Sequence, residues 1–83
     1  MMNEIKILFF ATMRDHIDER ELTLNIPAES TIADLKALLA ERYPGAATAL
    51  GATLVAIDQE YAFDHDVIPE EAEIAMFPHV SGG

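Results

Sequence analysis

The chain contains no cysteine. Disulfides, thiolate chemistry and cysteine-ligated zinc sites are therefore excluded. Long apolar runs are also missing, because the apolar stretch at residues 7–11 is far too short for a signal peptide or a membrane span. A small cysteine-free chain with neither of these segments is expected to be cytoplasmic.

Basic residues are scarce. Five Lys and Arg residues stand against fifteen Asp and Glu residues, which gives a net charge of −10. Such a charge argues against binding to nucleic acid or to anionic membrane surfaces, since both repel an acidic protein. It favours electrostatic attraction of this chain to basic partner proteins. The alternative is that the acidity only keeps the protein soluble.

With 83 residues the chain is too short for two ordinary domains, and half of its residues are apolar. A chain of this size buries roughly 60% of its unfolded surface and can build one modest core. The expected organisation is a single domain at residues 1–79 followed by a flexible tail at residues 80–83.

Alternating apolar residues predict strands at residues 5–10, 22–26, 54–57 and 74–77, with a further short strand near residues 62–63. Pro27 and Pro78 are expected to end two of these strands. The charged run at residues 14–21 is interpreted as a solvated hairpin loop.

One amphipathic helix is predicted at residues 31–43, where apolar residues recur every three or four positions. Thr31 and Asp34 resemble a capping box at its start, and Pro44 and Gly45 stop it. Residues 46–52 form a loop or a short helical turn. A single main helix across a mixed sheet predicts a two-layer α+β domain, and the element order fits the β-grasp arrangement among other small α+β folds.

The end of the sequence is unusual, because Gly82 and Gly83 close it a few residues after the last expected strand. Two terminal glycines arise by chance in roughly 0.5% of chains at average glycine usage. Frayed termini also tolerate glycine, so an incidental ending is the alternative. A tail without Cβ atoms is able to enter a narrow channel and present its α-carboxylate to the active site of a partner. The chain has no P-loop, so ATP for activating that carboxylate would be held by a separate enzyme.

A C-terminal carboxylate is able to carry sulfur as a thiocarboxylate, in which sulfur replaces one of its oxygens. Because the chain has no cysteine, it cannot hold sulfur as a persulfide, and a thiocarboxylate on Gly83 is the remaining form. A carrier without an internal thiol would also not lose this group to itself.

Several segments together resemble the MoaD/ThiS family of ubiquitin-like sulfur carriers, in particular its molybdopterin synthase members, over essentially the whole chain. They are residues 6–11 (Lys-Ile-Leu-Phe-Phe-Ala) with Arg14, the helix at 31–43, residues 55–61, and residues 73–83 with the ending Phe-Pro-His-Val-Ser-Gly-Gly. The paired phenylalanines and the Phe-Pro-x-Val-x-Gly-Gly ending carry the resemblance together. The resemblance implies a β-grasp, ubiquitin-like fold.

The resemblance also implies a cycle with two partners. A MoeB-like, E1-like enzyme that uses ATP and Mg²⁺ would adenylate Gly83, and a sulfur-transfer system would convert it to a thiocarboxylate. A MoaE-like large subunit would then receive Val80, Ser81 and Gly82 in its channel and transfer the sulfur to cyclic pyranopterin monophosphate. The family assembles as two small and two large subunits, and its catalytic side chains belong to the large one. This chain is thus expected to be a carrier without a stably bound cofactor, not an enzyme on its own.

By the same resemblance, Phe10, Tyr61, Phe77 and Pro78 form an apolar interface with the large subunit. Strand alternation supports an outward position for Phe10 and Phe77. The alternative is that these aromatic side chains complete the core, as aromatic side chains usually do.

The sequence gives little support for a metal site or for a nucleophilic serine. His16, His65 and His79 stand far apart in the sequence without the spacing of a ligand motif, so no metal site is expected. Ser81 has no neighbouring base and is not a nucleophile candidate. Departures from the family include His79 in place of a second proline, which leaves partner specificity open. The alternatives to a molybdopterin synthase carrier are a carrier for thiamine thiazole synthesis or tRNA thiolation, and a ubiquitin-like binding module.

Overall fold

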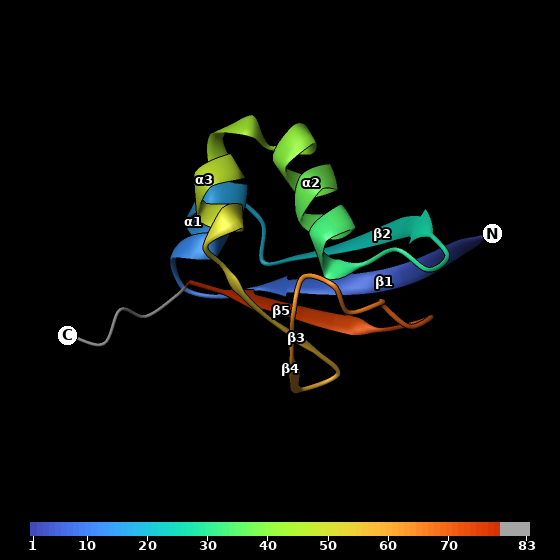
Figure 1. Cartoon of the computed structure of the whole chain (residues 1–83). Coiled ribbons are helices and arrows are strands. Elements are labelled where there is room, and N and C mark those ends of the chain that lie inside the picture. Colours follow the sequence, from blue (N-terminus) through green and yellow to red (C-terminus); the bar gives the residue numbers. More distant parts are fainter. Residues whose placement is uncertain (79–83) are drawn as a thin grey trace.

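The computed structural model describes residues 1–78 (Figure 1). Its elements, in chain order, are β1 (Met2–Phe9), α1 (Thr12–Ile17), β2 (Glu21–Pro27), α2 (Ile32–Arg42), the 3₁₀ turn η1 (Pro44–Ala46), α3 (Ala47–Gly51), β3 (Leu54–Ile57), β4 (Glu60–Ala62) and β5 (Glu73–Phe77). The predicted strands and the main helix are confirmed, and residues 46–52 take the short helical alternative.

The strands form one mixed sheet in the order β2-β1-β5-β3-β4. β1 runs parallel to β5, and the other neighbouring pairs are antiparallel. All three α-helices lie over the same face of this sheet (Figure 1). The arrangement is a two-layer α+β domain with the β-grasp topology, which confirms the predicted fold class.

Strand alternation decides which side chains form the core. In β1, Ile5, Ile7 and Phe9 are buried against the helices, while the residues between them lie on the opposite face. In the neighbouring strand β5, Ile74 and Met76 pair with Ile7 and Phe9 and are fully buried too. From α2, Ile32, Leu35 and Leu39 cover this layer. Full burial of each such side chain stabilises the fold by about 1.5–3 kcal/mol.

The main helix begins with the predicted capping box. The Asp34 amide donates to Thr31 Oγ1 at 3.2 Å, and the Thr31 amide donates to Asp34 Oδ2 at 3.0 Å. The two side chains therefore satisfy backbone donors that the first turn of the helix leaves unpaired.

The charged run at residues 14–21 connects the antiparallel strands β1 and β2, so the predicted hairpin connection is confirmed, but the prediction that this run is a loop throughout is wrong. Residues Thr12–Ile17 form α1 instead. Met13 and Ile17 lie four positions apart, one above the other on the same side of the helix, and both are buried. Asp18 ends the helix in the left-handed conformation, with φ 64°. The charged residues occupy the exposed side of this short helix, which is why charge alone suggested a loop.

Among residues 1–78, no helix is long and apolar enough to cross a bilayer.

Candidate functional site

The face of the sheet away from the helices carries an apolar surface. Phe9, Met76 and Val55 point into the core, so their strand neighbours Leu8, Ala75 and Ala56 point away from it. These outward residues form a row across the sheet, because Ala75 is paired with both Leu8 and Ala56. Ala56 is only 8% exposed although it lies outside the helix layer, so neighbouring side chains on this face cover it.

Tyr61 and Phe77 flank β3 on this same face. Tyr61 is paired with Ala56, and Phe77 is paired with Leu54, two residues earlier in β3. The two rings meet edge to face, with centroids 6.0 Å apart and an interplanar angle of 64°. Tyr61 is nevertheless 73% exposed and Phe77 is half-buried. The alternative that Tyr61 completes the core is therefore wrong.

The β3–β4 hairpin places Tyr61 on this face. Ile57 is paired with Glu60, so the turn consists of Asp58 and Gln59, which both have positive φ as a type I′ turn requires. The Asp58 carboxylate accepts a hydrogen bond from the Glu73 amide at 2.9 Å and ties the turn to the start of β5. A two-residue turn fixes the register of the hairpin, and register fixes which face a side chain occupies.

Phe10 extends the pairing of β1 with β5 by one residue. Its amide donates to the Met76 carbonyl at 3.0 Å, which places Phe10 next to Phe77 in register. Its side chain is 43% exposed. Directly after it, Ala11 adopts φ 52° and ψ −131°, and the Met13 amide donates to the Phe10 carbonyl at 3.1 Å. This tight turn takes the chain into α1 and leaves Phe10 at the end of the outer face.

The end of β5 is held by a residue that sequence reasoning missed. Thr53 is buried, and its hydroxyl donates to the Phe77 carbonyl at 2.9 Å. Because 24 residues separate the partners, no local pattern in the sequence indicates this bond. Pro78, half-buried, follows immediately. The bond fixes the last backbone carbonyl of the strand beside the aromatic pair.

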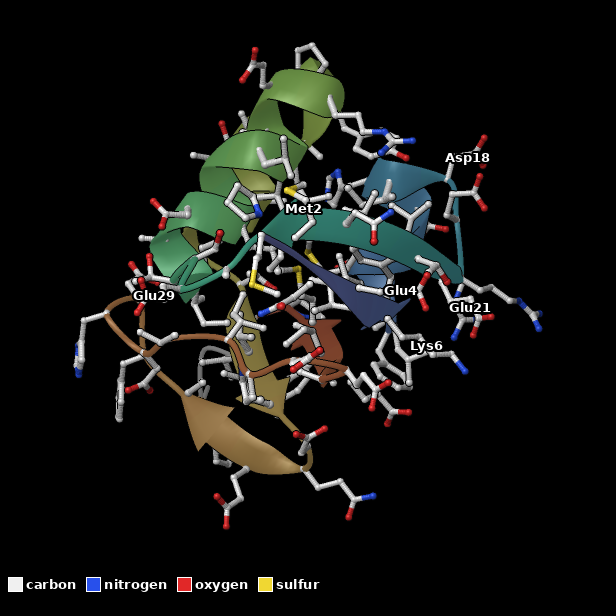
Figure 2. The ribbon with its side chains drawn as sticks, turned by 90° about the vertical axis from the view of Figure 1, so that its right-hand side faces the viewer. Met2, Glu4, Lys6, Asp18, Glu21 and Glu29 are labelled. Atoms are coloured by element: carbon white, nitrogen blue, oxygen red, sulfur yellow. The ribbon has the colours of Figure 1, made fainter. Side chains whose placement is uncertain are left out.

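On the outer face, apolar residues gather toward the end of β5, and charged residues lie over β1 and the starts of β2 and β5. Phe10, Leu54, Tyr61 and Phe77 lie toward the end of β5, and we call these four residues with Pro78 the aromatic face. At the start of β5, Glu73 is paired with Lys6, whose ammonium lies 3.5 Å from the Glu21 carboxylate. Figure 2 shows Glu4, Lys6 and Glu21 gathered on β1 and the start of β2. A partner that buries the aromatic face therefore avoids most of these charges.

The structure thus brings together Phe10, Tyr61, Phe77 and Pro78, the four predicted interface residues. The predicted tail residues, Val80, Ser81, Gly82 and Gly83, lie outside the described residues, as does His79.

Comparison with known proteins gives consistent matches. The model of the ThiS family matches residues 7–83. The molybdopterin synthase sulfur carrier subunit of Dictyostelium discoideum is 38% identical over 86 residues, covering 100% of both chains. The subunit of the same name from Caenorhabditis briggsae is 36% identical over 84 residues, covering 99% of this chain and 100% of its own length. Among solved structures, a complex of subunits 1 and 2 of molybdopterin-converting factor from Helicobacter pylori contains a chain that superposes with a TM-score of 0.62 at 23% identity, covering 100% of both chains.

Proposed function

The chain belongs to the ThiS family, and we propose that it is the sulfur-carrier subunit of a molybdopterin synthase. The observation that carries this proposal is the aromatic face beside the end of β5. An apolar surface at this place allows a partner to bind the folded domain and to receive the following residues in the same event. The names of the two relatives support the choice of molybdopterin synthase over other sulfur-transfer systems.

The proposed cargo site is the α-carboxylate of Gly83. An E1-like partner enzyme with Mg-ATP adenylates it, as one carboxylate oxygen attacks the α-phosphate and pyrophosphate leaves. A sulfur nucleophile then displaces AMP and leaves a thiocarboxylate. This order is needed because a carboxylate is a poor electrophile until one oxygen becomes part of a good leaving group. No cysteine of this chain competes for the sulfur.

The proposed acceptor is cyclic pyranopterin monophosphate, held by a MoaE-like large subunit. The thiocarboxylate sulfur attacks an electrophilic carbon of the substrate and forms a thioester between Gly83 and the substrate. Water then hydrolyses the acyl–sulfur bond, which leaves the sulfur on the substrate and returns Gly83 to a carboxylate. Val80, Ser81 and Gly82 thread the channel. Gly82 and Gly83 fit a narrow channel because they lack Cβ atoms. The chain contributes no catalytic side chain to this step. Its contribution is placement of the thiocarboxylate, which sets the effective concentration of sulfur at the substrate.

Phe10, Tyr61, Phe77 and Pro78 are the proposed contacts with the large subunit, in an assembly of two small and two large subunits. The exposure of Phe10 and Tyr61 supports this role, because exposed aromatic side chains are favourable anchors in protein interfaces. The solved Helicobacter pylori neighbour is itself a complex of subunits 1 and 2 of molybdopterin-converting factor. Thr53 supports the interface indirectly by fixing the carbonyl of Phe77.

The proposed loading reaction is tested by intact-mass spectrometry. We expect incubation with an E1-like enzyme, Mg-ATP and sulfide to add the mass difference between sulfur and oxygen once, in the C-terminal peptide. Deletion of Gly83 removes the shift, and so does one residue added after it, since the carboxylate is then displaced. A Ser81→Ala variant is the matched control and loads normally. Loading of the Gly83 deletion would overturn the proposal.

A further inference from the structure

A second apolar surface lies on the other side of the fold, in a groove between the end of β2 and α2. The groove has a volume of about 440 Å³, and its apolar lining includes Ile26, Pro27, Leu35 and Leu38. Leu35 is 1% exposed and forms its floor, whereas Leu38 is 39% exposed. An apolar side chain of a partner can therefore be buried in this groove.

The charge around the groove has one sign. Glu29, Asp34 and Glu41 line it, and none of the described residues in its lining is basic. Asp34 is engaged in the helix cap, whereas Glu29 and Glu41 are exposed. The nearby Arg42 guanidinium lies 5.9 Å from the centroid of the Tyr43 ring. In a protein of net charge −10, this rim favours Lys or Arg on either side of the inserted apolar residue.

The groove adjoins an open sheet edge. β2 is the outermost strand beside β1 in the described sheet. The Phe9 amide donates to the Arg20 carbonyl and the Ala28 amide to the Met1 carbonyl, so in an antiparallel ladder the even-numbered residues of β2 face β1. The amides and carbonyls of Thr23 and Asn25 consequently point outward. Pro27, without an N–H, closes the edge where the groove begins.

This edge and groove lie far from the aromatic face. β2 is antiparallel to β1, and β1 is parallel to β5, so β2 ends at the opposite end of the sheet from Phe77 (Figure 1). Figure 2 shows Glu21 and Glu29 at the two ends of β2 on this side of the molecule. A partner bound here leaves the aromatic face free.

We propose that the β2 edge and the adjoining groove bind an extended segment of a partner protein, in which an apolar residue is flanked by Lys or Arg. The segment adds to β2 as a strand through the backbone groups of Thr23 and Asn25. Its apolar side chain packs on Leu35 and Leu38, and its basic side chains pair with Glu29 and Glu41. Backbone pairing gives affinity in this binding mode, and the groove gives specificity. The site is independent of sulfur transfer and can be occupied together with the aromatic face.

The test uses the full chain and a synthetic peptide, Lys-Ile-Val-Ile-Lys, followed by amide chemical shifts. We expect shift changes at Thr23, Asn25, Ala28 and Leu38, and slower hydrogen exchange at the amides of Thr23 and Asn25. The matched peptide Glu-Ile-Val-Ile-Glu is expected to cause no such changes. Equal binding of the two peptides, or changes centred on Tyr61 and Phe77, would overturn the proposal.

Variants locate the site independently of the peptide. Leu38→Asp is expected to lower the affinity by about tenfold or more, since it places a charge in the apolar contact. Glu41→Lys is expected to lower it through charge repulsion, and Tyr61→Asp, on the other face, serves as the matched control. The exposure of Leu38 keeps the variant folded, which its amide spectrum verifies. Unchanged affinity in a folded Leu38→Asp variant contradicts the proposal.

Discussion

The hydroxyl of Thr53 donates a hydrogen bond to the carbonyl of Phe77 at 2.9 Å, and so links the residue before β3 to the last residue of β5. Thr53 is 6% exposed, so the bond is shielded from water. The residue that this bond fixes also belongs to the aromatic face. One side chain thus controls both the end of the sheet and the position from which the chain continues to Pro78.

Replacing Thr53 tests this link. Thr53→Val keeps the shape of the side chain and removes the donor, so we expect the free energy of unfolding to fall by about 1 kcal/mol. Thr53→Ser keeps the hydroxyl and is expected to retain most of the bond's contribution. Chemical denaturation measures both. A valine variant as stable as the parent chain would show that the bond contributes nothing.

The aromatic face is tested by Tyr61→Asp. Because Tyr61 is 73% exposed, the change is expected to alter the free energy of unfolding by less than about 1 kcal/mol. Binding to a MoaE-like large subunit is expected to weaken by about tenfold or more, since a carboxylate then enters an apolar interface. Titration calorimetry measures the affinity.

Leu38→Asp is the matched control for that experiment. It introduces the same charge on a partly exposed apolar residue, but on α2 and away from the aromatic face. If both variants weaken large-subunit binding equally, net charge is responsible and the assignment of the aromatic face is wrong.

Ala11 offers a test of backbone strain. Its φ of 52° and ψ of −131° are unfavourable for a residue with a Cβ atom, and glycine adopts them freely. We expect Ala11→Gly to raise the free energy of unfolding by about 1 kcal/mol, as relief of strain exceeds the entropic cost of glycine. Asp18→Gly is the comparison, because Asp18 has φ 64° in the common left-handed region and carries less strain. Thermal unfolding that shows Ala11→Gly to be the less stable protein would contradict this reading of the turn.

Most of the fold could be predicted from local patterns. Alternation in Ile5, Ile7 and Phe9 predicted β1 and its buried side, because a strand at a sheet interface has a period of two. The Thr31 and Asp34 pair predicted where α2 begins, since a capping box is a local interaction. Pro78 predicted the end of β5, because proline has no backbone N–H to donate to a neighbouring strand.

The missed features depend on contacts between distant residues. α1 has a single pair of buried residues, Met13 and Ile17, which is too few for a periodic signal within a charged run. The contact of Tyr61 with Phe77 requires the registers of β3 with both β4 and β5. The Thr53 bond spans 24 residues. The exposure of Tyr61 was predicted from family resemblance alone, whereas strand alternation also supported an outward position for Phe10.

The net charge of −10 predicts a salt-dependent rate of association. If basic surfaces on the activating enzyme and the large subunit attract this chain, the association rate constant falls steeply as ionic strength rises, because screening shortens the reach of the field. Stopped-flow measurements between low and physiological salt test this. An association rate constant that does not change with ionic strength would show that the acidic residues contribute to solubility and not to association.

The central claim is that sulfur carried on Gly83 becomes the sulfur of molybdopterin. The most direct measurement is a single-turnover reaction of the thiocarboxylated chain with a MoaE-like subunit and cyclic pyranopterin monophosphate, without a further sulfur source. We expect molybdopterin to form in step with the loss of the sulfur–oxygen mass difference from the chain, and Tyr61→Asp to slow the reaction while Leu38→Asp leaves it unchanged. Retention of the thiocarboxylate with no molybdopterin formed, in a mixture where the two proteins bind, would contradict the account.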